Sequence, residues 1–150
     1  IRASIVNVKI LNSRGEQVNT LQRGHKYTYQ YTAEFTEDKK DINYGMLIKT
    51  INGTELGGSS TCNYLERSGI NARAGEEYLV EFNFNCMINP GTYFINAVII
   101  GIHYNALTYI SRISDACIFQ VLPISHNTST GTIDFEIKSK ISIYNQTISS

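Results

Sequence analysis

The stretch Lys26–Phe35, KYTYQYTAEF, decides the fold class of this chain. Apolar or tyrosine side chains occupy every second position, and polar side chains occupy the positions between them. Alternation with a period of two predicts a β-strand with one face in a core and the other toward solvent. The expected buried face consists of Tyr27, Tyr29, Tyr31, Ala33 and Phe35.

The same alternation recurs along the chain, in runs separated by turn residues. Three further period-two runs are Ser4–Ile10, Tyr44–Ile51 and Glu77–Cys86. The turn signals between runs include Ser13-Arg14-Gly15, Asn52-Gly53 and Asn89-Pro90-Gly91. Many short strands at this spacing predict an all-β, antiparallel β-sandwich of jelly-roll or immunoglobulin-like type. A helical turn or two is expected only at residues 63–69.

One expected strand, Tyr93–Tyr104, is apolar on both faces. Such a strand lies deep in a sheet and has its outer face covered as well. Leu47 and Ile118, on the neighbouring strands, extend this outer apolar patch. A partner subunit or a ligand is the favoured cover, and the local segments Gly53–Thr61 or Asn63–Ala72 are the alternative.

The C-terminal part has a different pattern. Pro123–Thr130 has the composition of a linker, and alternation resumes after it with Ile133, Phe135 and Ile137. We therefore divide the chain into a sandwich domain, residues 1–122, and a linker with a C-terminal strand arm, residues 123–150. The arm either folds back or adds to the sheet edge of another chain, which predicts a homodimer with an exchanged strand.

Composition excludes several classes of protein. The 13 basic and 13 acidic residues balance, so the basic excess of a nucleic-acid binder is absent. Three widely spaced cysteines have no metal-ligand spacing, which favours buried thiols in a reducing compartment over one disulfide with a free thiol. Because the chain begins in mid-sequence at Ile1, we interpret it as a fragment of a longer protein.

The sequence contains few residue patterns typical of a catalytic site. We therefore expect a non-catalytic domain that binds no metal or cofactor. His25, His103 and His126 lack the spacing of metal ligands, and no nucleophile elbow is present. A glycan-processing enzyme stays open as a weaker alternative, because paired carboxylates such as Asp115 need not be neighbours in sequence.

Side chains suited to sugars gather around one expected hairpin. Aromatic faces cover the C–H surface of a sugar, and planar polar groups share its hydroxyls. The predicted carbohydrate-binding residues are His103, Tyr104, Asn105, Tyr109, Arg112 and Asp115, extended on the outer face by Asn96 and Lys49. An ordinary polar hairpin is the alternative.

An ordered set of motifs resembles one known family. The opening strand runs into Asn12-Ser13-Arg14-Gly15, and later come Tyr44–Lys49, Asn89-Pro90-Gly91-Thr92-Tyr93 and a final Phe119-Gln120-Val121. This order, over residues 4–122, resembles the C-terminal domain of Wzt, the nucleotide-binding subunit of ABC transporters that export O-antigen polysaccharides. Family members often carry a Trp before the last core strand, where this chain has Leu107–Arg112 without Trp.

The resemblance implies a function and an assembly. It implies recognition of a terminally modified O-antigen polysaccharide, and thus substrate specificity for export. It also implies a homodimer with exchanged C-terminal strands. The ATPase domain, absent from this fragment, would join it to a membrane-spanning transporter subunit at the cytoplasmic side of the inner membrane. The alternative is a structural or adhesive immunoglobulin-like domain of a cell-surface protein, favoured by sequons such as that at Asn52.

Overall fold

The fold consists of strands joined by turns. The computed structural model describes residues 3–61 and 70–144, and for His103 the backbone only. The helical turn expected at residues 63–69 and the side chain of Cys62 lie outside the described residues. No helix of the kind that could cross a bilayer occurs in the part of the chain that is described.

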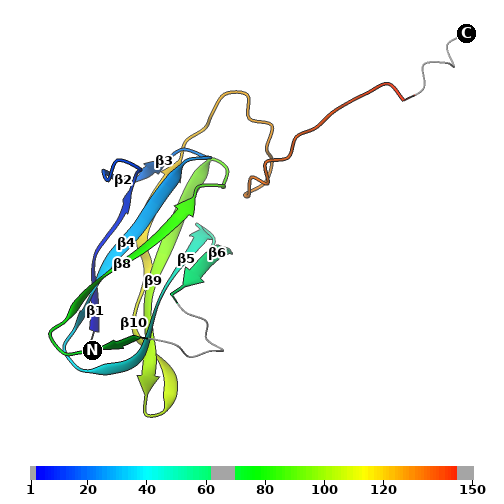
Figure 1. The fold of residues 1–150 in the computed structure, drawn as a ribbon. Helices are drawn as coiled ribbons and strands as arrows, with labels where there is room; N and C mark the ends of the chain where they lie inside the picture. Colours follow the sequence, from blue (N-terminus) through cyan, green and yellow to red (C-terminus); the bar gives the residue numbers. More distant parts are fainter. Residues whose placement is uncertain (1–2, 62–69, 145–150) are drawn as a thin grey trace, which may run out of the picture.

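Two sheets pack face to face, with β4 and β8 crossing over β9 and β10 (Figure 1). The four-stranded sheet is antiparallel, in the order β2 (Gln17–Val18), β1 (Ala3–Leu11), β4 (Lys26–Phe35) and β8 (Glu77–Asn85). The six-stranded sheet has the order β3 (Thr20–Leu21), β10 (Ala106–Val121), β9 (Gly91–His103), β5 (Lys39–Thr50) and β6 (Glu55–Ser60). Its sixth strand, β7 (Ile70–Ala72), pairs with β5, and β3 runs parallel to β10. The predicted all-β sandwich is confirmed.

Strand β4 supplies the centre of the core, as its alternation predicts. Tyr29 and Tyr31 are fully buried between the sheets. The Tyr31 hydroxyl donates to the carbonyl oxygens of Gly45 at 3.0 Å and Val98 at 3.2 Å, in the opposite sheet. These hydrogen bonds satisfy a polar group that would otherwise be costly to bury, and they fix β4 relative to β5 and β9.

A tyrosine corner closes one end of the sandwich. Tyr93 follows the Pro90-Gly91 turn, and its hydroxyl donates to the carbonyl oxygen of Asn89 at 2.6 Å. Its ring stacks on Phe119 of β10 with 5.6 Å between the ring centroids. The entry of β9 is therefore tied to β10 by one hydrogen bond and one aromatic contact.

The irregular pairing of β10 with β9 explains why alternation in the sequence does not predict β10 as one continuous strand. Its register against β9 shifts between Tyr109 and Ser111, and again between Ile113 and Cys117. The first shift inserts one extra residue into β10 and reverses the face of the side chains that follow, whereas the second inserts two and leaves their faces unchanged. A period-two search therefore detects fragments of this long strand rather than the whole.

The described cysteines are free thiols. Cys86 is buried and Cys117 is half-buried. Burial raises the pKa of both thiols, because the thiolate would lose its hydration. Neither of these two cysteines forms a disulfide in the structure, and the predicted redox compartment stays a prediction.

The protein should lose stability in alkali because of its buried tyrosines. Burial raises the pKa of Tyr29 and Tyr31 well above the ordinary value of 10.0. In the unfolded chain both ionise near that pH, whereas in the folded chain they stay protonated. Their contribution is therefore complete below about pH 10 and falls as the pH rises toward the folded-state pKa values, by up to about 2.7 kcal/mol per pH unit for two groups.

Urea unfolding at about pH 8, 10 and 11 measures this decline. The variant Tyr31→Phe removes one ionising group and should lower the slope above about pH 10. An equal free energy of unfolding across the whole series would contradict the prediction.

The C-terminal segment first lies against the sandwich and then leaves it as an extended arm. After β10 the chain crosses the end of the sandwich, and Ile133 forms an isolated antiparallel bridge with Ile88. Residues 135–144, the free arm, then leave the sandwich in an extended path (Figure 1). Its five large hydrophobic side chains are each at least 72% exposed: Phe135, Ile137, Ile141, Ile143 and Tyr144. The composition of residues 123–130 suggested a loose linker, but hydrogen bonds to the body hold Asn127 and Ser129.

Candidate functional site

The outer face of the six-stranded sheet carries the candidate site. Alternate residues of β9 point outward and are half-buried, among them Asn96 and Val98. On the neighbouring strand Leu47 lies opposite Asn96, and Gly45 lies opposite Val98. Arg112 of β10 lies opposite Val98 on the other side. Residues distant in sequence thus share one surface.

A shallow groove of about 400 Å³ crosses this face. It is lined by Gly45, Met46, Leu47, Glu55, Gly58, Ser59, Ser60, Asn96, Val98, Tyr109 and Arg112. Two glycines line the groove, and a larger side chain at either position would fill part of it. A Cβ atom added to Gly45 would lie 2.7 Å from Cγ1 of Val98, and one added to Gly58 would meet the β5 backbone.

Three polar side chains are connected beside the groove. The Asn96 side-chain oxygen accepts a hydrogen bond from the backbone N–H of Asp115 at 2.9 Å. Asp115 sits in the second bulge of β10 with φ of 56°, in the left-handed region. Its carboxylate contacts the Lys49 ammonium at 2.8 Å. The bulge and Asn96 together aim the carboxylate across β9 toward β5.

Tyr109 and Arg112 form the second part of the site. The Arg112 guanidinium lies 5.2 Å from the centroid of the Tyr109 ring. Tyr109 remains 59% exposed, so much of its surface is open to a ligand. It also lines a second hollow of about 410 Å³ with Ile100, Leu107 and Thr108. The Tyr109 ring therefore borders both hollows, and its cation–π contact with Arg112 restrains its position.

The predicted binding residues divide into two groups. Lys49, Asn96, Tyr109, Arg112 and Asp115 come together on the outer face. Tyr104 and Asn105 instead form the tip of the β9–β10 hairpin, with φ of 50° and 61°. Neither of the two hollows around Tyr109 is lined by them. His103 ends β9, and its side chain lies outside the described residues.

Strand β6 supplies lining residues that sequence reasoning did not assign to the site. Glu55, Gly58, Ser59 and Ser60 border the groove, because β6 pairs with β5. The Gly57-Gly58-Ser59-Ser60 run was the available signal. Its composition favours a turn, and only the pairing with β5 makes it a groove wall.

The chemistry of this surface suits binding through shared hydrogen bonds. It combines an aromatic face, a guanidinium, an ion pair and small hydroxyl side chains in an open groove. Among residues 3–61 and 70–144, no group of three histidine, cysteine or acidic side chains is placed to hold a metal. The Asp115 carboxylate is already engaged by Lys49.

The two packed sheets with an open groove on one face place this chain in the class of all-β sandwich domains. The model of one family, the Wzt C-terminal domain, matches residues 2–135. The chain therefore belongs to the Wzt C-terminal domain family, a domain of an ABC transporter subunit.

Solved structures support the same fold. The crystal structure of the C-terminal domain of Wzt is 24% identical, with a TM-score of 0.77 over 95% of this chain and 84% of that one. A Pseudomonas fluorescens alkylpurine DNA glycosylase, AlkC, is 10% identical with a TM-score of 0.52, over 80% of this chain and 30% of that one. At these identities the likeness concerns the fold. None of the curated protein sequences matches the chain.

Proposed function

We propose that this domain binds a terminally modified O-antigen polysaccharide and thereby confers substrate specificity on the ABC transporter that exports it. The observation that carries the proposal is the groove across β6, β5, β9 and β10, bordered by the Tyr109–Arg112 pair. Membership of the Wzt C-terminal domain family supplies the transporter context.

The shape and chemistry of the groove fit a sugar chain better than a compact ligand. The groove is shallow and open, so a polymer can enter and leave along the sheet. Tyr109 offers a ring face for the C–H surface of a sugar, and Arg112, Asn96 and Ser60 offer polar groups at its edge. We therefore propose that the sugar binds on this surface rather than at the hairpin tip.

The proposed assembly has three further parts. Two copies form a homodimer through exchanged C-terminal strands. Each copy continues into an ATPase domain that contacts the membrane-spanning transporter subunit. The complex lies on the cytoplasmic side of the inner membrane. The exposed apolar side chains of the free arm support the dimer, because an amphipathic strand without a partner tends to add to a sheet edge.

The other functions considered from sequence have less support. An adhesive domain of a cell-surface protein does not belong to a transporter subunit, so the family membership favours export. A glycan-processing enzyme needs an acid or base free to act, whereas Asp115 forms an ion pair with Lys49.

Calorimetric titration of the chain with the cognate polysaccharide tests the proposal. We expect binding to the finished polymer and much weaker binding to the same polymer without its terminal modification. Absence of binding to either polymer by a folded sample would refute a carbohydrate-binding function.

A further inference from the structure

A third hollow, of about 610 Å³, lies at the end of the sandwich opposite the N-terminus, around β2 and β3 (Figure 1). Its lining comes from residues 12–27, which form the turn after β1, the strands β2 and β3, and the turn that leads into β4. It shares no lining residue with the groove or with the hollow beside Tyr109, other than through the order of the chain. Its volume is within the range of ligand pockets.

The turn between β1 and β2 forms one wall of the third hollow. The Asn12 side-chain oxygen accepts hydrogen bonds from the backbone N–H groups of Arg14 at 2.9 Å and Glu16 at 3.0 Å. The Asn12 amide also donates to the Glu16 carboxylate at 3.3 Å. Asn12 therefore holds the backbone of this turn and engages its carboxylate, while the side chain of Arg14 lines the hollow.

The turn into β4 forms a second wall. Its backbone is tied to the residue after β8, because the Gly24 N–H donates to the Cys86 carbonyl oxygen at 2.7 Å and the Cys86 N–H donates to the His25 carbonyl oxygen at 2.9 Å. The side chains of His25 and Lys26 line the hollow from this turn. Basic side chains thus reach the hollow from two walls whose backbones are held by hydrogen bonds.

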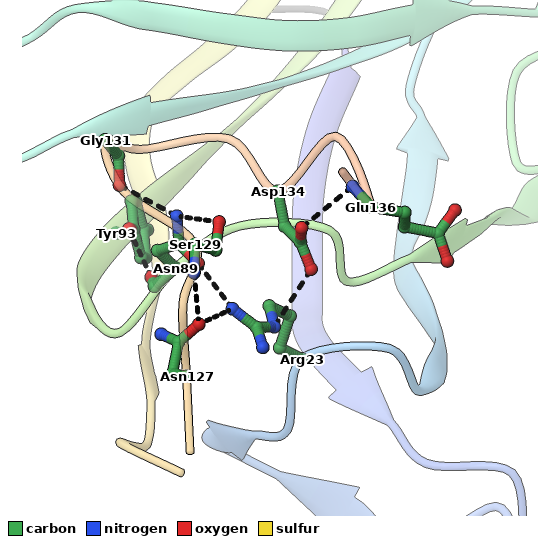
Figure 2. Close-up of polar contacts among 8 residues, drawn as sticks. All are labelled: Arg23, Asn89, Tyr93, Asn127, Ser129, Gly131, Asp134 and Glu136. Carbon is green, nitrogen blue, oxygen red and sulfur yellow. Dashed lines mark hydrogen bonds and ion pairs between the residues drawn. The ribbon is translucent and has the colours of Figure 1, made fainter. Parts of the chain in front are cut away.

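Arg23, on the same turn, shows how a structural cation is treated in this protein (Figure 2). Its guanidinium contacts the Asp134 carboxylate at 3.0 Å. It also donates to the side-chain oxygens of Asn89 at 2.7 Å and Asn127 at 2.6 Å. The Asn89 amide in turn donates to the carbonyl oxygen of Gly131 at 2.9 Å. The charge of Arg23 is therefore neutralised within the fold, and Arg23 does not line the third hollow.

The basic side chains of the third hollow have no such partners. Within residues 3–61 and 70–144, no carboxylate forms an ion pair with Arg14, His25 or Lys26. Glu16 is the one acidic side chain among the described lining residues. A hollow bordered by two unpaired cations and a single carboxylate has a positive potential, which attracts an anion.

A buried tyrosine hydroxyl supplies a further donor at the same place. Tyr27 is 7% exposed and lines the third hollow. Its oxygen accepts a hydrogen bond from the backbone N–H of Gln22 at 2.8 Å. A phenol can also donate one hydrogen bond, and no acceptor for the Tyr27 proton occurs in the part of the chain that the structure describes. An anionic oxygen in the hollow would satisfy this donor, which is costly to leave buried and unpaired.

We propose that the third hollow binds a phosphate group, either free or carried on a sugar or a lipid. The Arg14 guanidinium has the fork geometry that suits phosphate oxygens, Lys26 adds a point charge, and Tyr27 donates its hydroxyl proton. Because these donors come from separate parts of the lining, they suit a tetrahedral group better than a planar carboxylate. This site is independent of the proposed sugar groove, so either can fail without the other.

NMR titration of the full chain with glucose 1-phosphate tests this site. We expect the amide signals of residues 13–16 and 24–27 to shift. Arg14→Gln and Lys26→Gln should each weaken binding by about tenfold, the loss typical of a hydrogen bond to a charged group. Arg73→Gln is the matched control, because Arg73 is also an exposed arginine but does not line the hollow. Its affinity should equal that of the unchanged chain.

Further probes identify the carrier of the phosphate. Tighter binding of glucose 1-phosphate than of inorganic phosphate would assign a sugar phosphate, and equal binding would assign free phosphate. Sedimentation with phosphatidylglycerol vesicles that Arg14→Gln abolishes would assign a lipid headgroup. Each of these results supports the site.

Three results would overturn the proposal. Glucuronate that binds as tightly as glucose 1-phosphate would replace the phosphate with a general anion. Equal losses for Arg14→Gln and Arg73→Gln would show attraction to the overall charge of the chain rather than to the hollow. A folded sample whose amide signals at residues 13–16 and 24–27 shift with none of the phosphate probes would remove the site altogether.

Discussion

Deletion of residues 135–150 should convert the protein from a dimer to a monomer without unfolding the sandwich. The deleted segment contains the apolar side chains of the free arm, which are at least 72% exposed in one copy and which a second copy would bury. Light scattering at micromolar concentration measures the change in mass. The cut after Asp134 matters, because a cut before residue 131 would also remove the partners of Arg23 and Asn89.

Matched substitutions separate the loss of a strand from the loss of chain length. Ile137→Asp places a charge on the apolar side of the arm and should weaken the dimer, whereas Lys138→Asp on the polar side should have a small effect. Thermal melting should give nearly equal values for all three variants at concentrations where the full chain is monomeric. A dimer that survives the deletion would show that another surface joins the copies.

Tyr109→Ala should lower the affinity for the polysaccharide by roughly 30-fold or more, about 2 kcal/mol, as expected for a central aromatic side chain in a binding site. The ring borders both hollows of the outer face and is supported by Arg112. Arg112→Ala should also weaken binding, because it removes both a cation and the support for the ring. Tyr109→Trp should preserve binding, since it keeps a large aromatic face at the same position.

Tyr104→Ala is the matched control for this prediction. Tyr104 lies on the same hairpin and is 90% exposed, but it lines neither hollow beside Tyr109. Its removal should change the affinity less than threefold, a difference typical of residues outside a binding hot spot. Calorimetry with the same polysaccharide measures both variants. Equal losses for Tyr104→Ala and Tyr109→Ala would assign recognition to the hairpin tip instead.

The candidate site shows how far sequence reasoning reaches. Tyr109, Arg112 and Asp115 were predicted from their density of sugar-competent groups, and Asn96 and Lys49 from their place on the outer face. Tyr104 and Asn105 belong to the same dense stretch, yet they form the turn. The tight turn between β9 and β10 makes the difference, because Tyr104 and Asn105 lie beyond the last paired residues, His103 and Ala106, at the end of the sheet.

The sequence by itself determined the all-β class, the buried face of β4 and the corner at Tyr93, because strand alternation and turn chemistry are local properties. It also showed the amphipathic pattern of the arm. Only the tertiary structure decided where the groove lies, since Gly45, Gly58, Val98 and Arg112 meet through the order of strands in a sheet. The same holds for the ion pair between Arg23 and Asp134 at 3.0 Å, a contact between distant segments that no local pattern encodes.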